Sequence, residues 1–541
     1  MATGYADLIL VNSNVLTLGN EPSKATAVAI SGKRILAVGD DSLCDDLRGA
    51  ATTVVDLRGA TVTPGLVDSH THPVMGLQMT QGVDLSGCAT LDDVRASLAA
   101  AGRDLGRDEW LTGWGLDPNV FGNAALGYEV LGSVMQGRPV VLSIFDGHSL
   151  VVSEEVLRRA HIDGPREFDS RSVIVCDESG RPTGHLLEEG AQRLVLDIIP
   201  SAGVDERRAR LAELLAGMAA TGLTGGHVMD LDDDALGLYQ DLDEQNALPL
   251  RLRLAPWCRP DDDASKREAI RGLVGKGGRL WSVAAVKLFM DGTIDGGTAW
   301  LHEPDCHGES TAAYWRNLQD YTQAVRFFAQ ARVQTATHAI GDAAVQHVLD
   351  TLERVTPSDS AVRHRVEHIE TLPTDQVHRF AQLGVVASMQ PTHATDYTKA
   401  DHTDNWSERL GDLRADDGWR CRDIWDAGGV VTLGSDWPVA PYDPRGVLAA
   451  AQLRRPAGSP DAAPVGPAQA LTALQALSGY TRAPAYAAGM ENSTGRIAAG
   501  YLADLTVLAE DPIAVPPEDL SHVPVRMTIV DGRILHRSEA G

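Results

Sequence analysis

The feature that most constrains this chain is a long alternation of strand-like and helix-like segments across its middle. Short apolar runs are separated by stretches in which apolar residues recur every three or four positions, which is the period of a helix. One predicted helix face carries Leu211, Leu214, Leu215 and Met218. The predicted strands lie at 60–72, 221–230, 250–257, 282–292, 333–340, 362–369, 384–393 and 429–438. Eight strands with intervening helices are the number in a (β/α)8 barrel, so we predict an α/β fold built on a TIM-like barrel.

The chain ends have a different texture from this middle. They alternate apolar and polar residues and are punctuated by Gly, Asn and Asp, and IVDGRILHR near one end is similar to AISGKRILAVG near the other. We predict one small β-sandwich domain from 1–64 plus 496–541, with the barrel at 65–495. Two unrelated edge hairpins are the alternative. Residues 80–200 interrupt the regular spacing, and we interpret them as an insertion that covers the barrel mouth.

Composition and charge exclude several partners. The 541 residues include 74 acidic and 47 basic side chains, a net charge of −27, which disfavours nonspecific binding to nucleic acid. No apolar run approaches the roughly 18 residues of a membrane helix, and MATGYADLIL lacks the features of a secretory signal. The six cysteines form no C-x-x-C pair and fit a reducing compartment. We therefore expect a cytoplasmic protein with a small-molecule substrate and no nucleic-acid or membrane partner. The oligomeric state stays open, with a homodimer among the options.

Histidine and aspartate occur where several predicted strands end. His70 and His72 are two residues apart at the end of the first strand, so both face the same side. His338, His368 and Asp436 close the fifth, sixth and eighth strands. The carboxyl ends of barrel strands converge on one mouth. Imidazole and carboxylate are usual ligands of Zn²⁺, so the pattern predicts a centre for one or two divalent ions, with zinc as the first candidate.

Lys287 lies near the end of the fourth predicted strand, among these ligands. A free ammonium has no acceptor and cannot ligate a metal. Two metals about 3.5–4 Å apart need a bridging ligand, and a lysine carbamylated by CO₂ is an anion with two oxygens. We predict that Lys287 is carbamylated, with an ordinary ion-paired lysine as the alternative.

Seven motifs then give the chain a family resemblance. They are VTPGLVDSHTH, DGHSLVVSEEVL, VKLFMDGTIDG, THAIGDAAV, RVEHIE, SMQPTH and LGSDWPV, in that order. With them the sequence resembles the amidohydrolase superfamily, and within it amidohydrolase family 3, which contains N-substituted formamide deformylases. The resemblance covers essentially the whole chain. It implies metal ligation by the four histidines and Asp436, with carbamylated Lys287 as the bridge. HEPDCHGES departs from the family pattern and bears on the substrate pocket.

Further residues are predicted around the metals. Asp436 is the predicted proton shuttle, because a carboxylate can take the proton of an activated water and pass it to the leaving nitrogen. His393, at the end of the seventh strand, is predicted to contact the substrate carbonyl or the oxyanion; a structural role is the alternative. The resemblance suggests that Asp117 and His148 of the insertion approach the substrate. Asp291 is also assigned to substrate binding, with the fixing of a loop as the alternative.

Three tryptophans predict an aromatic pocket. Trp257 and Trp437 follow predicted strands, and Trp114 lies in the insertion. Such rings would line a site for an apolar or aromatic substituent. Packing between barrel and insertion is the alternative.

The leading functional prediction is a metal-dependent hydrolase of a small C–N amide, with N-substituted formamides as candidate substrates. A cyclic imide or hydantoin hydrolase, or a heterocycle deaminase, would use the same site. A catalytically silent ligand-binding or regulatory protein is the alternative of another class. The presence of every expected ligand type disfavours that last alternative.

Overall fold

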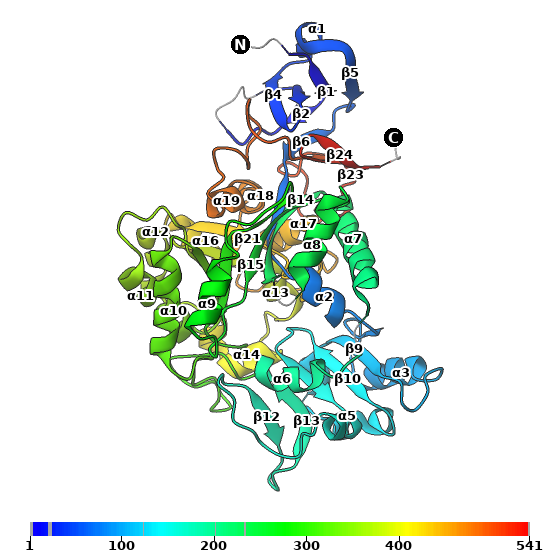
Figure 1. Ribbon diagram of the computed structural model, residues 1–541, viewed down its shortest axis with the longest axis vertical. Helices are drawn as coiled ribbons and strands as arrows, with labels where there is room; N and C mark the ends of the chain where they lie inside the picture. Colours follow the sequence, from blue (N-terminus) through cyan, green and yellow to red (C-terminus); the bar gives the residue numbers. More distant parts are fainter. Residues whose placement is uncertain (1–3, 20–23, 123, 201, 232–233, 539–541) are drawn as a thin grey trace.

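The protein is described here by a computed structural model that covers residues 4–19, 24–122, 124–200, 202–231 and 234–538. Figure 1 shows three parts along the long axis. Strands from both chain ends lie at the top, parallel strands wrapped by helices occupy the middle, and residues of the insertion form the bottom.

Eight parallel strands in the middle part coincide with the predicted segments, and only β14 extends one residue beyond its segment. They are β7 (Leu66–Thr71), β14 (Leu223–Leu231), β15 (Arg251–Pro256), β17 (Ala285–Phe289), β18 (Gln334–Ala339), β19 (Arg365–His368), β20 (Val386–Met389) and β21 (Val430–Leu433). One sheet has the order β16-β15-β14-β7, with β16 at Trp281–Val283, and the other runs β17-β18-β19-β20-β21. Parallel bridges at Trp257–Lys287 and Thr71–Trp437 join the two sheets at both edges. Within each sheet these parallel strands neighbour one another in chain order.

Amphipathic helices cover the outside of these strands. In the helix predicted from Leu211, Leu214, Leu215 and Met218, all but the partly exposed Leu214 are buried. The same periodicity buries one face of the two helices that flank β18. The longer helices are α7 (Val204–Ala220), α8 (Ala235–Glu244), α9 (Ala264–Arg271), α10 (Leu318–Gln330), α11 (Asp342–Val355) and α17 (Pro444–Leu453). Shorter ones are α2 (Pro73–Met79), α12 (Arg379–Leu383), α13 (Pro391–Asp396), α14 (Asn405–Leu410), α15 (Asp412–Ala415), α16 (Cys421–Asp426), α18 (Ala473–Gly479) and α19 (Arg482–Ala487).

The insertion has its own sheet, in the order β12-β13-β11-β10-β9-β8. Its strands are β8 (Val83–Asp84), β9 (Leu111–Leu116), β10 (Val140–Ile144), β11 (Ser149–Val152), β12 (Val173–Cys176) and β13 (Pro182–Leu187). Its helices are α3 (Leu91–Ala101), α4 (Tyr128–Leu131), α5 (Glu154–Arg159) and α6 (Glu188–Leu196). Every residue of β10 and β11 is buried, so the loop between these strands starts from a rigid base.

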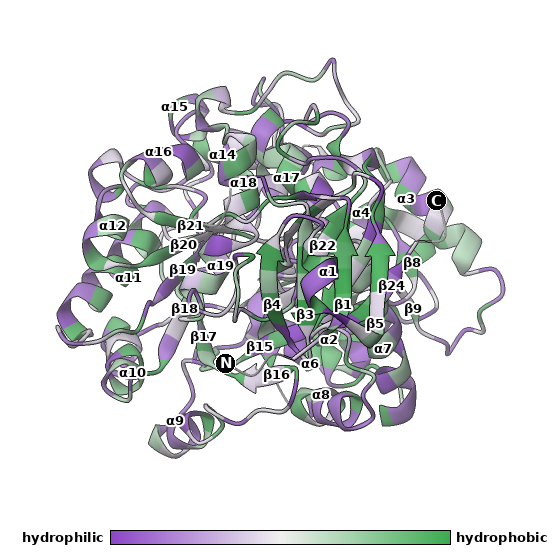
Figure 2. Ribbon diagram, turned by 90° about the horizontal axis from the view of Figure 1, so that it is seen from above, coloured by the Kyte–Doolittle hydropathy of each residue, from purple (hydrophilic) through white to green (hydrophobic). Residues whose placement is uncertain are grey.

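The two chain ends pack together. One sheet has the order β4-β3-β1-β5, and the other, β2-β6-β22-β23-β24, mixes strands from both ends. The strands are β1 (Ala6–Val11), β2 (Asn14–Val15), β3 (Ala27–Ser31), β4 (Arg34–Gly39), β5 (Arg48–Asp56), β6 (Thr61–Pro64), β22 (Leu505–Leu508), β23 (Val525–Val530) and β24 (Arg533–Arg537), with α1 at Leu43–Leu47. Leu10, Val62 and Leu505 belong to one apolar cluster, and Figure 2 shows hydrophobic residues along β1 and β3. The division into domains at residues 64 and 496 stays a prediction.

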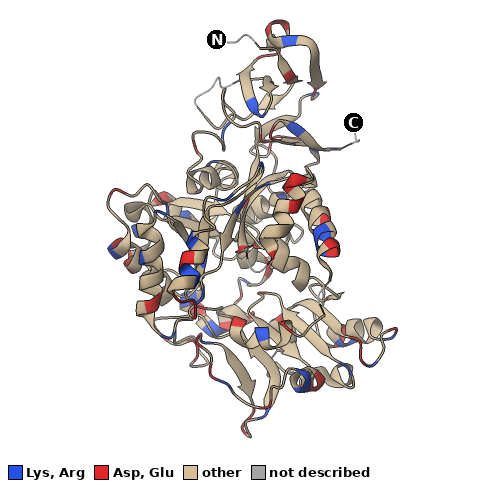
Figure 3. Ribbon diagram, in the orientation of Figure 1, with Lys and Arg blue, Asp and Glu red and all other residues tan. Residues whose placement is uncertain are grey.

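The distribution of charged residues and the hydropathy of the helices agree with what the composition predicts. Figure 3 shows acidic and basic segments side by side along α7. Within the described ranges, no helix combines the length and the apolar character needed to cross a membrane.

Candidate metal centre

His70 and His72 bring their Nε2 atoms together at the end of β7. The two atoms are 3.1 Å apart, as expected from their period-two spacing. His70 Nδ1 lies 2.7 Å from Glu367 Oε2, whose pKa is well below its usual range because neighbouring Arg365 outweighs the effect of burial. The imidazole therefore donates Nδ1–H to an ionised carboxylate, and its Nε2 keeps a free lone pair toward His72.

His338 and His368 are oriented in the same manner. His368 Nδ1 lies 3.0 Å from Gln390 Oε1, and His338 Nε2 lies 3.0 Å from the Gly292 carbonyl. Because each ring donates one N–H to an oxygen, its second nitrogen is free to ligate. The centroids of these two rings are 4.5 Å apart. Burial holds the pKa of both well below the usual range, so they are neutral.

Asp436 completes the group at the end of β21. Its Oδ1 lies 3.0 Å from His72 Nε2 and 3.4 Å from His70 Nε2. Burial opposes ionisation, but His70 and His72 outweigh it and hold the pKa of Asp436 below its usual range. Gly434 permits this approach, because a Cβ there would lie 2.6 Å from the His70 amide nitrogen. His70, His368 and Asp436 each offer one ligand atom, and these atoms lie within 4.8 Å of one another.

The group fits a metal by its unpaired atoms. Among the described residues, His72 Nδ1, His393 Nε2 and Asp436 Oδ1 are buried and have no hydrogen-bond partner. Buried polar atoms without partners are rare in folded proteins. Imidazole nitrogens beside an ionised carboxylate form a donor set that Zn²⁺ prefers.

Lys287 lies within this cluster. It is fully buried, its Nζ is 3.2 Å from His70 Nε2, and its ammonium forms no ion pair with a carboxylate in the described chain. Burial lowers the pKa of Lys287 to about 8. The lowered pKa makes the neutral amine, which reaction with CO₂ requires, more populated than in an exposed lysine.

A cavity of about 530 Å³ opens above these residues. His393, on α13, lines it with its Nε2 3.8 Å from Asp436 Oδ2, so it faces the mouth as predicted. Trp257 also lines the cavity, as predicted. The other aromatic residues of the wall are Phe145, Phe289, Tyr314, Tyr397, Trp406 and Trp419. An aromatic lining is therefore present, mostly from residues that the sequence did not single out.

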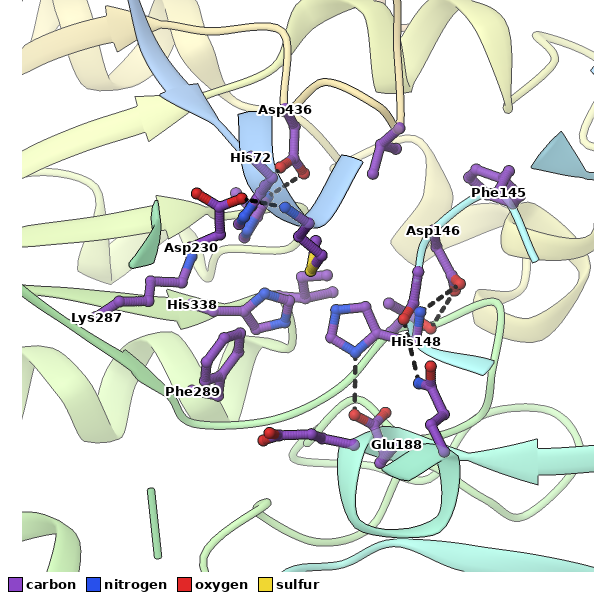
Figure 4. A pocket seen from close by; sticks show the side chains of 18 of the residues that line it. His72, Phe145, Asp146, His148, Glu188, Asp230, Lys287, Phe289, His338 and Asp436 are labelled. Carbon is purple, nitrogen blue, oxygen red and sulfur yellow. Dashed lines mark hydrogen bonds and ion pairs between the residues drawn. The ribbon is translucent and has the colours of Figure 1, made fainter. Parts of the chain in front are cut away.

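The insertion contributes the loop between β10 and β11. Figure 4 shows His148 and Glu188 facing the same space as Lys287, His338 and Asp436. His148 Nδ1 lies 3.0 Å from Glu188 Oε2. Burial opposes the charge on His148, but Glu188 outweighs it and raises the pKa of His148 to about 9. The approach of His148 was predicted, whereas its partner Glu188 was missed.

Four residues that were predicted to bind substrate are not among the lining residues of this cavity. Trp114 and Asp117 are absent from the cavity wall; Trp114 lies within β9, and Asp117 accepts a hydrogen bond from the Asn119 amide at 2.8 Å. Asp291 is buried and accepts backbone N–H groups from three residues, namely Trp300, Ile340 and Gly341, so it fixes two loops. The Trp437 ring packs against Gly76 and Tyr442 outside the cavity. A position near a strand end does not determine whether the side chain points into the cavity or away from it.

Imidazoles and a carboxylate at the carboxyl ends of parallel strands, at the floor of one cavity, define the site class of a metal-dependent α/β hydrolase. The model of the amidohydrolase family matches residues 53–536, and the chain belongs to that family. This confirms the resemblance: the protein is a metal-dependent amidohydrolase that acts on C–N bonds.

Individual relatives cover nearly the whole chain. YtcJ of Bacillus subtilis is 29% identical over 535 residues, covering 96% of this chain and 98% of YtcJ. An N-substituted formamide deformylase from Arthrobacter pascens is 28% identical, covering 98% of both chains. An uncharacterised metal-dependent hydrolase from Pyrococcus horikoshii has a TM-score of 0.72 at 24% identity, covering 94% of this chain and 99% of its own. An adenosine deaminase from Xanthomonas campestris, solved with bound zinc, has a TM-score of 0.54 at 15% identity, covering 98% and 93%.

Proposed function

We propose that this amidohydrolase cleaves the C–N bond of a small N-substituted amide, with N-substituted formamides as the first substrate class. The observation that carries the proposal is the oriented imidazole and carboxylate cluster on the floor of a 530 Å³ cavity with aromatic walls. The relative named N-substituted formamide deformylase, which matches over 98% of both chains, supports the choice of substrate. The aromatic walls suit an apolar substituent on the amide nitrogen.

Zinc is the proposed metal, at one or two ions per chain. His70, His72, His338, His368 and Asp436 would hold it, with a carbamate on Lys287 as the bridging ligand. When bound, zinc supplies a Lewis acid that polarises the amide carbonyl and makes water a stronger nucleophile. The burial of Lys287 without an ion-paired carboxylate supports the carbamate, because carbamylation removes the buried ammonium charge and leaves an anion that can ligate a metal.

The chain's own residues move the proton and place the substrate. Asp436 accepts the proton of the attacking water at a carboxylate oxygen and returns it to the departing amide nitrogen. His393, whose Nε2 has no partner within the described residues, is placed to hydrogen-bond the substrate oxygen. The His148–Glu188 pair fixes the insertion side of the cavity. The aromatic walls exclude bulk water from the amide.

The proposal also includes the architecture around the site. The bridges at both sheet junctions support a closed (β/α)8 barrel, and the shared apolar cluster supports a β-sandwich built from both chain ends. The six free cysteines agree with a cytoplasmic location.

A substrate screen on zinc-loaded, metal-quantified protein tests the function. Formamides with aromatic and aliphatic N-substituents would be compared with acetamides, ureas, hydantoins and aminated heterocycles. We expect one to two zinc ions per chain and release of formate plus a primary amine. Ammonia release from a heterocycle would favour a deaminase, and ring opening of a hydantoin would favour a cyclic amide hydrolase. Turnover of acetamides but not formamides would remove the formamide assignment and keep the amidase.

A further inference from the structure

A second cavity lies at the opposite ends of the strands from the metal centre. This second cavity has a volume of about 50 Å³. The first residues of β7, β14 and β15 line it, together with residues that follow α19 and with Asp504 before β22. A space of this size holds a few water molecules or one small ion.

Two arginines on β15 enter this cavity, and their surroundings differ. Arg251 is ion-paired, with Nε 2.7 Å from Asp504 and a second nitrogen 3.2 Å from Asp531. Arg253, two residues along the same face, has no hydrogen bond or ion pair with any described residue, although it is only partly exposed. A guanidinium stays charged, and a charge removed from bulk water is costly unless it is paired. Arg253 therefore lacks a counterion.

His227 adds a second donor to the same cavity. Its Nδ1 lies 2.6 Å from a nitrogen of Arg365. Because a guanidinium only donates, Nδ1 must be the acceptor and the imidazole proton must lie on Nε2. Among the described residues, the side-chain hydrogen bond of His227 is the one at Nδ1, so Nε2–H is left to face the cavity. Arg365 and Arg253 add to the effect of burial and hold the pKa of His227 well below its usual range, so the ring is neutral.

The polar groups in the wall that could accept these hydrogen bonds are engaged elsewhere. Asp504 accepts from Arg251 and from the Asp531 amide, the latter at 2.7 Å. The Thr224 hydroxyl donates to the Leu66 carbonyl at 3.1 Å. The cavity thus presents a cation and an N–H donor without a matching anion.

We propose that the second cavity binds a small monovalent anion, a halide or a short carboxylate, between the Arg253 guanidinium and the His227 Nε2–H. The volume excludes large anions, and a planar carboxylate matches the fork of a guanidinium. The site is separate from the catalytic cavity. It shares Arg365 with the metal centre, because Arg365 also donates to Glu367 Oε2 at 2.9 Å, and Glu367 accepts from His70. Anion binding is therefore best measured without relying on turnover.

Thermal unfolding of the metal-free, full-length protein tests the proposal. The protein would be compared in sodium gluconate, whose anion is too large, and in sodium chloride or sodium formate at equal ionic strength. We expect a saturable rise in Tm of about 2 °C with the small anions, because a ligand that binds only the folded state stabilises it. Crystals grown in bromide should show an anomalous peak beside Arg253 and His227. Equal Tm values in all three salts together with no such peak would overturn the proposal.

Two variants separate anion binding from a structural role. Arg253→Met should be at least as stable as the wild type in gluconate, since it removes an unpaired charge, and should lose the response to chloride and formate. Arg251→Met, the matched control, should be less stable in every salt and should keep that response. If Arg253→Met does not fold, Arg253→Lys keeps the charge without the fork. It should respond to chloride more than to formate. An undiminished response in Arg253→Met would contradict the site.

Discussion

The barrel strand ends and the insertion line the same cavity, but they build it in different ways. His70, His72 and Asp436 leave strands whose carboxyl ends must converge, and their atoms meet within 3.4 Å. His148 and Glu188 leave a loop and a helix start in the insertion. The barrel side holds atoms that lack protein partners, whereas the insertion side closes on itself through an ion pair. The barrel side is therefore arranged for chemistry and the insertion side for shape, and substitutions should separate rate from binding.

The largest loss should come from Asp436→Asn on the barrel side. Turnover should fall by about 10²–10⁴-fold, because an amide cannot accept the proton of the attacking water. Substrates with better amine leaving groups should lose less. Steady-state kinetics on protein of measured zinc content checks this. A metal-loaded variant that turns over near the wild-type rate would transfer the proton role to another group, and His393 would be tested next.

Lys287→Ala should have the second-largest effect, a loss of turnover of about 100-fold. The variant removes the anion proposed to bridge two metals, so zinc content should fall with the rate. Short carboxylic acids should restore part of both, because their two oxygens replace those of a carbamate. Elemental analysis and kinetics in acetate measure the rescue. Density for a free ammonium that points away from bound metals would contradict carbamylation.

The residues at the strand ends show how much of the site could be predicted from the sequence. Each predicted segment overlaps one of the eight strands that end at the metal centre side, and period two correctly placed His70 and His72 on one side. Period two fails at His368, which follows Glu367 directly yet also reaches the centre. Its φ of 75° lies in the left-handed region, and Asp436 (φ 58°) shares this conformation. Backbone deviations of this kind at strand ends are not visible in apolar periodicity.

The insertion shows a different limit of sequence reasoning. Trp114 and Phe145 are both aromatic residues of the same sheet region, but only Phe145 lines the cavity. The direction of each ring depends on how the insertion sheet is placed over the barrel, which local patterns do not encode. Glu188 likewise follows a strand of the insertion and carries no motif of its own. Its role emerges only from its contact with His148.

A matched aromatic pair tests which residues of the insertion contact the substrate. Phe145→Leu should raise KM by about 3–10-fold with a small change in kcat, because it removes an aromatic surface and the stacking on Tyr397. Trp114→Phe should leave both constants within about twofold, the range expected for a residue off the cavity wall. Kinetics with an N-benzyl and an N-alkyl formamide measure the difference. Equal effects of the two variants would restore Trp114 to the substrate site.

The smallest predicted effect is a change of Tm with pH that depends on the His148–Glu188 ion pair. The pKa of His148 is raised from 6.5 to about 9 in the folded protein. The ion pair therefore contributes its full free energy to folding below pH 6.5, and this contribution is lost as pH rises through about 9. Tm should therefore fall by a few degrees between these limits. In His148→Gln the fall should be smaller by that amount. Thermal unfolding of both metal-free proteins across the range provides the comparison, and parallel curves would show that the pair is not ionised.

The pairing of β6 with β22 has a consequence for biosynthesis. The Thr63 hydroxyl and the Thr506 carbonyl that meet there are 443 residues apart. At about 5–20 residues per second, a ribosome needs roughly 20–90 s between making one strand and the other. During that time the apolar face of β6 remains in the nascent chain without its partner strand β22. The sheet can therefore form only after β22 and β23 have been synthesised. Ribosome-associated chaperones that shield exposed strands should therefore increase the yield of this protein more than that of a single-domain barrel without strands from both termini.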